Sequence, residues 1–474
     1  MKTGFLKTTI SIILLVLCTH LHSQENILKN HALVSDIYIL GNKTTKDVIV
    51  LRELPFKKGD LVEISRIDEL ITSGKNNLIN LSLFNFTNIS YNIIENDNTS
   101  GLPEINIMID LEERWYYWPR IDVSLEDRNL SSWLKKPSWE RITYSIGANI
   151  YNLLGYNQSL SIVYAFGYQT GFRLDYNNIS IGKKGEHYIG FSLSGRYRKT
   201  ENVTSEYDEP IYMKSDNVYL SRRESFILHY TYRPKLRIFN VFSVEYENKR
   251  ISQDILDRNP DYWGGDNLKR EGIYLGYDFI SDQRDNIQYP LNGYYVGAGM
   301  RAYTDFNSSL IYSKIIGDFR YYNNFSGRWS YAFRLSAGAS VKNQAAYTFD
   351  RAIGYDDIGL RGYEYYVVDG QHYITLNPTM RYNIIPTKII NLNFMPLSKF
   401  KKTHFALYGK AFFDTGYVAH NSPYPLNTLS NKFLYSYGVG VDMVTYYDIT
   451  LSVDYSFNQF FKHGFYISLK SPIL

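Results

Sequence analysis

The sequence contains a single cysteine, Cys18, among 474 residues. Cys18 lies in an N-terminal segment that we expect to be removed, so the mature chain would carry no thiol. A chain without thiols forms no disulfide and offers neither a cysteine-ligated zinc site nor a cysteine nucleophile. Functions that depend on a cysteine thiol are therefore excluded.

Long hydrophobic runs and an excess of one charge are also absent. No later segment offers about 18 consecutive apolar residues, so the sequence predicts no transmembrane helix. The 51 basic residues nearly balance the 47 acidic ones, which leaves a formal net charge of +4. This balance does not indicate nucleic-acid binding.

Recognisable catalytic motifs are missing as well. The sequence has no Gly-x-Ser-x-Gly elbow, no His-Glu-x-x-His helix and no glycine-rich phosphate loop. The nine histidines are scattered along the chain. We therefore predict no catalytic residues, no metal site, no cofactor and no enzyme activity.

Aromatic residues are abundant, with 45 Tyr and 26 Phe. This content suits a membrane barrel, in which aromatic side chains form girdles at the two bilayer interfaces. At the N-terminus, Lys2 and Lys7 precede a short apolar stretch at 10–17, and polar residues follow to Ser23. This pattern predicts a secretory signal peptide at residues 1–23 and then a linker at 24–32.

Residues 33–113 show the pattern of a small α+β module. Alternating apolar residues predict strands at 34–40, 86–94 and 104–111, and helical spacing predicts helices at 44–53 and 65–77. This order, with Gly41-Asn42, Gly59-Asp60 and Leu83-Phe84-Asn85, resembles a POTRA domain. The resemblance implies a periplasmic module that receives unfolded chains by adding a strand to its sheet edge, and a simple spacer is the alternative.

From Trp115 onward apolar residues recur with a period of two, which predicts antiparallel strands. Short links follow the even strands and longer links mostly follow the odd ones, as in outer-membrane barrels. A long link at 384–402, on the short side, is the exception. No blade repeat is visible, and the strands are long for a soluble sandwich. We therefore predict a mostly β fold in which residues 114–474 form a 16-stranded antiparallel transmembrane β-barrel, with strands near 118–126, 140–152, 156–168, 171–181, 186–198, 222–233, 239–247, 271–281, 292–304, 311–323, 328–341, 372–383, 403–415, 431–443, 446–457 and 464–469.

Three motifs in this region resemble the BamA/TamA outer-membrane assembly superfamily, which combines POTRA modules with a bacterial surface antigen type barrel. The segment Leu360-Arg361-Gly362-Tyr363 is similar to the tip of its sixth loop. Phe412-Phe413-Asp414-Thr415-Gly416 is similar to its "F.D.G" strand. Asp282-Gln283-Arg284, together with 289–293, resembles its periplasmic turn. With the N-terminal module, the resemblance spans nearly the whole mature chain.

The resemblance implies that the loop folds into the lumen and that Arg361 meets Asp414 there. An arginine inside a barrel needs a carboxylate, which its planar guanidinium can bind at two points. Gly362 allows the loop to approach the wall closely. Where the family often has a further acid, this chain has Thr379, so either the network is reduced or Glu364 takes that place.

The first and last strands form the predicted seam. Pro119 cannot donate a hydrogen bond to a ladder, and Gly464 begins a short last strand that continues with Phe465. The resemblance implies that this seam opens and templates incoming strands. We therefore expect a protein of the bacterial outer membrane, with its POTRA-like domain in the periplasm, that assists the assembly or insertion of other proteins.

Two alternatives stay open: a polypeptide secretion transporter of the same superfamily, or a passive outer-membrane channel. The expected partners are unfolded outer-membrane client proteins and outer-membrane lipid, with periplasmic or lipoprotein partners as a further option. Nucleic acid is not expected as a partner.

Overall fold

The computed structural model describes residues 30–94, 102–125, 139, 142–182, 185–215, 217–355, 358–391, 402–445 and 449–470. The expected signal peptide and most of the expected linker lie outside these ranges. The chain divides into two compact units, and the division falls between Arg114 and Trp115. In the described part of the chain, no helix is long and apolar enough to cross a membrane.

The first unit is a four-stranded sheet with two helices. The strand order is β2-β1-β4-β3, and β1 runs parallel to β4. Ile105, Ile107 and Ile109 alternate along β4 and are buried, together with Leu78 of helix α3. The elements are β1 (His31–Leu40), α2 (Asp47–Leu51), β2 (Leu61–Glu63), the 3-10 turn η1 (Ile64–Arg66), α3 (Ile67–Asn80), β3 (Phe84–Ile94) and β4 (Glu104–Glu113).

Strand β2, which has only three residues, was not predicted from the sequence. It pairs with His31, Ala32 and Leu33 at the start of β1. In the described residues, no strand pairs with the rest of that β1 edge, on the side away from β4. An edge of this kind can accept an added strand.

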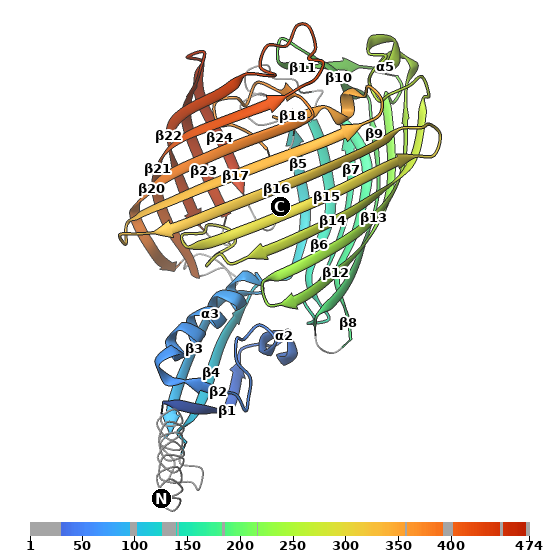
Figure 1. Cartoon of the computed structure of the whole chain (residues 1–474). Coiled ribbons are helices and arrows are strands. Elements are labelled where there is room, and N and C mark those ends of the chain that lie inside the picture. Colours follow the sequence, from blue (N-terminus) through green and yellow to red (C-terminus); the bar gives the residue numbers. More distant parts are fainter. Residues whose placement is uncertain are drawn as a thin grey trace, which may run out of the picture. The chain divides into compact units, whose positions relative to one another are not determined.

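The second unit is one antiparallel sheet of sixteen strands that curls into a barrel (Figure 1). This confirms the predicted fold class, and each predicted strand overlaps an observed one. The strands are β5 (Tyr117–Leu125), β6 (Ile142–Leu153), β7 (Gln158–Gly167), β8 (Gln169–Ile181), β9 (His187–Arg198), β12 (Ser221–Lys235), β13 (Ile238–Ile251), β14 (Lys269–Asp282), β15 (Gly293–Asp305), β16 (Ile311–Asn324), β17 (Trp329–Lys342), β20 (His372–Asn391), β21 (Lys402–Ala419), β22 (Phe433–Thr445), β23 (Ile449–Asn458) and β24 (His463–Lys470).

The two faces of the barrel wall differ in polarity, as the predicted alternation of apolar and polar residues along each strand requires. On β20, Thr375 and Thr379 are buried, whereas the alternating Ile374, Leu376 and Met380 are exposed. Successive side chains of a strand point to opposite faces. The exposed apolar face is therefore the outer one, and the buried hydroxyls face the lumen.

The long link at 384–402, which broke the sequence pattern, begins and ends in strand: residues 384–391 belong to β20 and Lys402 to β21, and residues 392–401 lie outside the described ranges. Strands β20 and β21 pair with each other from His372 as far as Asn391 and Lys402. The neighbouring strands stop earlier, because β17 pairs with β20 only to Tyr382 and β22 pairs with β21 only from Ala406. The end of this hairpin therefore extends past the strands beside it.

The long loops at the opposite end of the barrel pack together into a folded cap, which we call the dome. The Asp208 carboxylate accepts hydrogen bonds from the backbone N–H groups of Thr428 and Leu429, each at 2.9 Å. The Asp208 carbonyl oxygen accepts one from the N–H of Val367 at 2.8 Å. Three separate loops are joined in this way. The dome contains β10 (Thr200–Glu206), β11 (Glu209–Lys214), α5 (Gln253–Arg258), η3 (Tyr347–Phe349), β18 (Arg351–Ile353) and β19 (Val368–Asp369), none of which was predicted.

Candidate functional site

The loop between β17 and β20 places Arg361 against the β21 wall. The Arg361 guanidinium donates to both carboxylate oxygens of Asp414, over 2.8 Å from Nε and 2.5 Å from Nη2. The Arg361 backbone N–H donates to the same carboxylate at 3.0 Å. The Asp414 side chain is 0% exposed and that of Arg361 is 22% exposed. Because a buried carboxylate needs a compensating partner, this pair fixes the loop tip to the wall.

Two more groups of the wall hold the same guanidinium. Its central carbon lies 3.8 Å from the centre of the Phe412 ring, which is a close cation–π contact. Thr379 on β20 accepts a further hydrogen bond from Nη2 at 3.0 Å. Arg361 is thus bound to two adjacent strands at once.

Glu364 lies on the same loop, three residues after Arg361. It accepts a hydrogen bond from the Gly362 backbone N–H at 2.8 Å. Burial raises the pKa of Glu364 to about 8, and the nearby Asp454 and Asp414 act in the same direction. On the wall, Thr379 is an additional acceptor for Arg361.

Two glycines allow the loop to lie this close to the wall. Gly362 adopts a φ of +90°, in the left-handed region that favours glycine, and a Cβ atom there would lie 3.3 Å from Cβ of Ser436. A Cβ atom on Gly416 would lie 3.0 Å from a methyl carbon of Leu360. A side chain at either position would therefore press the loop away from the barrel wall.

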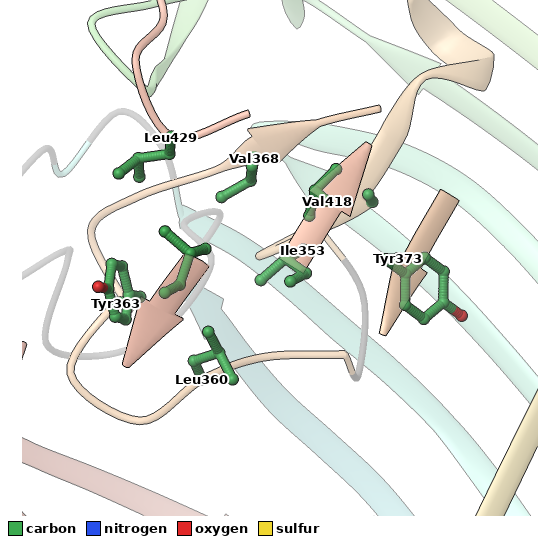
Figure 2. Close-up of a cluster of buried hydrophobic side chains, with 9 residues drawn as sticks. Ile353, Leu360, Tyr363, Val368, Tyr373, Val418 and Leu429 are labelled. Atoms are coloured by element: carbon green, nitrogen blue, oxygen red, sulfur yellow. The ribbon is translucent and has the colours of Figure 1, made fainter. Parts of the chain in front are cut away.

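Leu360 and Tyr363, on either side of the Arg-Gly pair, are buried in an apolar cluster. Figure 2 shows Leu360 and Tyr363 together with Ile353, Val368 and Val418, which come from the same loop and from β21. Burying these side chains removes apolar surface from water and adds to the ionic contact. The full cluster comprises Ala352, Ile353, Leu360, Tyr363, Val368, Tyr373, Val418, Leu429 and Leu434.

The loop tip also contacts each of the last three strands. The Tyr363 hydroxyl donates to the Tyr435 carbonyl oxygen of β22 at 3.2 Å. The side-chain amide of Asn458, the last residue of β23, donates to the Gly362 carbonyl oxygen at 3.1 Å. The rings of Tyr365 and of Tyr466 on β24 lie 5.8 Å apart. The loop therefore supports the strands that end at the seam.

In the described part of the chain, β5 and β24 stand at the two ends of the sheet order. The sheet order runs from β24 to β5, and within the described residues no backbone pairing joins these two strands to each other. Pro119 pairs with Ala148 of β6, and Gly464 pairs with Ser456 of β23. Phe465 is exposed, and its ring lies 4.7 Å from that of Tyr455. All three predicted seam residues thus lie on strands that are paired on one side only.

A second contact across the barrel was missed by the sequence analysis. In the turn between β14 and β15, the Tyr289 hydroxyl donates to Asp442 of β22 at 3.0 Å. Arg381 of β20 donates to the Pro290 carbonyl oxygen at 3.0 Å, and its guanidinium carbon lies 4.7 Å from the centre of the Tyr289 ring. This turn therefore forms a floor under the lumen at the short-turn end.

Between the loop tip and the floor lies a cavity of about 580 Å³, lined by charged side chains that include Arg361, Arg381 and Lys410. Lys410 bridges Asp442 at 2.6 Å and Asp454 at 2.7 Å. The alternation of side chains along β21 indicates that Lys410 points to the same face as Asp414, into the lumen. No local pattern indicated its partners, which lie on other strands.

Comparisons with known proteins agree with this architecture. Residues 32–114 match the family model described as POTRA, "Surface antigen variable number repeat". BamA from Haemophilus ducreyi lacking POTRA domains 1–3 is 13% identical, with a TM-score of 0.50 and coverage of 90% of this chain and 81% of that one. CdiB from Escherichia coli is 9% identical, with a TM-score of 0.53 and coverage of 92% and 76%. No curated protein sequence shows significant similarity to the chain. At these identities the solved structures describe a shared fold.

Proposed function

Because the chain is in its fold a BamA/TamA-like protein, a POTRA domain followed by a sixteen-stranded barrel, we propose that it assists the assembly or insertion of other proteins at the bacterial outer membrane. The barrel would lie in that membrane and the POTRA domain in the periplasm. The dome then faces the outside, and the short turns face the periplasm. Its clients would be unfolded outer-membrane proteins, and its partners would include membrane lipid and periplasmic or lipoprotein subunits.

The observation that carries the proposal is that, among the residues the structure describes, no backbone ladder joins β5 to β24. Each backbone group left unpaired in the hydrocarbon core costs several kcal/mol, so membrane barrels normally pair all of them. Two edges that do not pair with each other can instead be extended by the strands of a client. A passive pore would gain nothing from such edges.

The loop tip and the POTRA edge have separate roles in this proposal. Through the Arg361–Asp414 pair, the loop holds β22, β23 and β24 in place, so that the β24 edge keeps a defined position. Pro119 leaves the β5 edge without one backbone donor. The open part of the β1 edge in the POTRA domain would receive a client strand before the client reaches the barrel.

A folding assay tests the proposed function directly. The purified protein, reconstituted in liposomes, is expected to accelerate the folding of a urea-unfolded outer-membrane barrel, measured by the appearance of its compact band on unheated gels. Liposomes that contain an ordinary porin at the same density control for defects around any inserted barrel. Equal rates in the two preparations would argue against assembly activity, and protease protection of a client inside the liposomes would favour secretion.

Conductance measurements distinguish the proposed assembly function from that of a passive channel. The dome at one end, the loop tip within the lumen and the floor at the other end all narrow the path through the barrel. We expect planar bilayers that contain the protein to lack the steady open level of a sixteen-stranded porin. A stable, long-lived open level would favour the channel alternative.

A further inference from the structure

The end of the β20–β21 hairpin has no role in the proposed client handling. We define the arm as residues 383–391 of β20 and 402–405 of β21. Residues 388–391 pair with 402–405, whereas the β17 ladder ends at Tyr382 and the β22 ladder ends at Ala406. A two-stranded hairpin alone in water has little stability, so an arm of this kind needs a surface to contact.

One face of the arm continues the lipid-facing side of the barrel. Paired residues of antiparallel strands share a face, and the register pairs Lys388 with Phe405 and Ile390 with Thr403. Ile384, near the start of the arm, lies on the outward side that begins with Ile374 and Met380. Ile384 and Ile390 are 46% and 41% exposed, so apolar surface continues along this face beyond the end of the β17 ladder. The outward face thus combines aliphatic side chains with Lys388.

The arm begins where the membrane-spanning part of the wall ends. Tyr382 and Trp329 form an outward-facing pair at the last register position of β17, with ring centres 4.8 Å apart. Aromatic side chains of this kind mark the bilayer–water interface. The isoleucines that follow lie beyond that interface, at the level of the lipid head groups.

The charge of this region has one sign. From Gly370 to Phe413 the sequence contains no Asp or Glu and six Lys or Arg, of which Arg381 and Lys410 are bound in the lumen and the other four lie at 388–402. Lysines near a membrane surface are attracted to anionic lipids, and aliphatic side chains enter the boundary between head groups and acyl chains. An anionic lipid surface therefore matches both the charge and the apolar content of the arm.

The backbone at the base of the arm allows it to turn toward that surface. The pairing register shifts twice, between Asn383 and Ile385 and again between Ile385 and Lys388. Register shifts of this type bend a strand and increase its local twist. Pro386 lies in the second irregular stretch, where the loss of a backbone donor is tolerated.

We propose that the arm docks its outward face on the periplasmic leaflet of the outer membrane. Ile384, Ile390 and Phe405 contact the acyl boundary, and Lys388 meets anionic phosphates. The arm anchors the short-turn rim beside β20 and β21, the strands that hold Arg361. This anchoring does not depend on whether the barrel handles clients.

Two adjacent residues with opposite orientations provide the test. Ile390 lies on the outward face, whereas Ile389 pairs with His404 on the other face and is also exposed. In a full-length Cys18→Ser background, Ile390→Cys and Ile389→Cys carry the same environment-sensitive fluorophore and are reconstituted in phosphatidylcholine vesicles with or without phosphatidylglycerol. With anionic lipid, the Ile390 probe is expected to shift to shorter wavelength and to be quenched by nitroxide-labelled lipid, whereas the Ile389 probe stays in water.

Charge provides a second readout. The Lys388→Gln variant, which removes one cation near the surface, is expected to lower the ratio of docked to undocked arm about fivefold. High salt acts in the same direction, because it screens the attraction between lysine and lipid phosphate. If the Ile390 probe stays in water in both vesicle types, the proposal is overturned, and a soluble protein partner becomes the occupant to seek. If the Ile389 and Ile390 probes respond alike, the assignment of the faces is wrong and the proposal fails.

Discussion

A disulfide that joins β5 to β24 is expected to abolish client handling while the barrel stays folded. Cysteines at Ser124 and Ser468, and in neighbouring registers, would be introduced in a Cys18→Ser background. A covalent link between the two edges prevents a client strand from entering between them, so the expected loss is complete and reversible by reduction. The measurement is the rate of client folding in liposomes before and after addition of a reductant.

The matched control is a disulfide on the other side of the same strand. Val453 and Ile467 are register partners on β23 and β24, so cysteines at these positions link two strands that are already paired. This link is expected to leave client folding unchanged. If the protein with the crosslinked seam works as well as its reduced form, seam opening is not the mechanism.

The substitution Arg361→Ala is expected to lower the free energy of unfolding of the barrel by about 3–5 kcal/mol, because it leaves the Asp414 carboxylate buried without its cation. The reverse variant, Asp414→Ala, should lower the free energy of unfolding by a smaller amount. Arg361, which would lose its partner, is partly exposed to the lumen cavity and can keep some hydration. The temperature at which the compact band disappears on gels measures both effects. Because Arg361 and Asp414 contact each other, the double variant should lose less unfolding free energy than the two single variants lose in total.

Arg301 provides the comparison for Arg361. Its guanidinium contacts Asp278 at 2.8 Å, but the two side chains are 34% and 26% exposed and belong to neighbouring strands. A partly exposed ion pair contributes about 0–1 kcal/mol, so Arg301→Ala should change the gel transition little. Equal transitions for Arg361→Ala and Arg301→Ala would show that the loop tip does not stabilise the barrel.

The barrel strands were predictable because each of them is in contact with two different environments. An apolar outer face and a polar lumen impose an alternation that can be read residue by residue, as in Ile374, Thr375 and Leu376. The dome carries no such alternation, because its loops pack on one another in irregular directions. Helix α5 and the β10–β11 hairpin were therefore missed. The three-residue strand β2 is too short to show any period.

The candidate site was predictable to the extent that its residues lie in recognisable local motifs. Leu360 to Tyr363 and Phe412 to Gly416 were found in this way, and the structure brings the two segments together. The acceptor role of Thr379 and the contact between Tyr289 and Asp442 could not be predicted. Those contacts depend on which strands lie opposite each other across the lumen, and a single sequence does not contain that information.

The contacts of the loop tip also set an order for the folding of this protein. Asp414 follows Arg361 by 53 residues, and Asn458 follows Gly362 by 96. Contacts between residues so far apart in sequence form slowly, because much of the chain must first be ordered. Because Asp414, Tyr435 and Asn458 all follow the loop in the sequence, the loop tip cannot complete its contacts until β21, β22 and β23 have formed. Docking of Arg361 is therefore a late event, and it marks a barrel that has been built to its end.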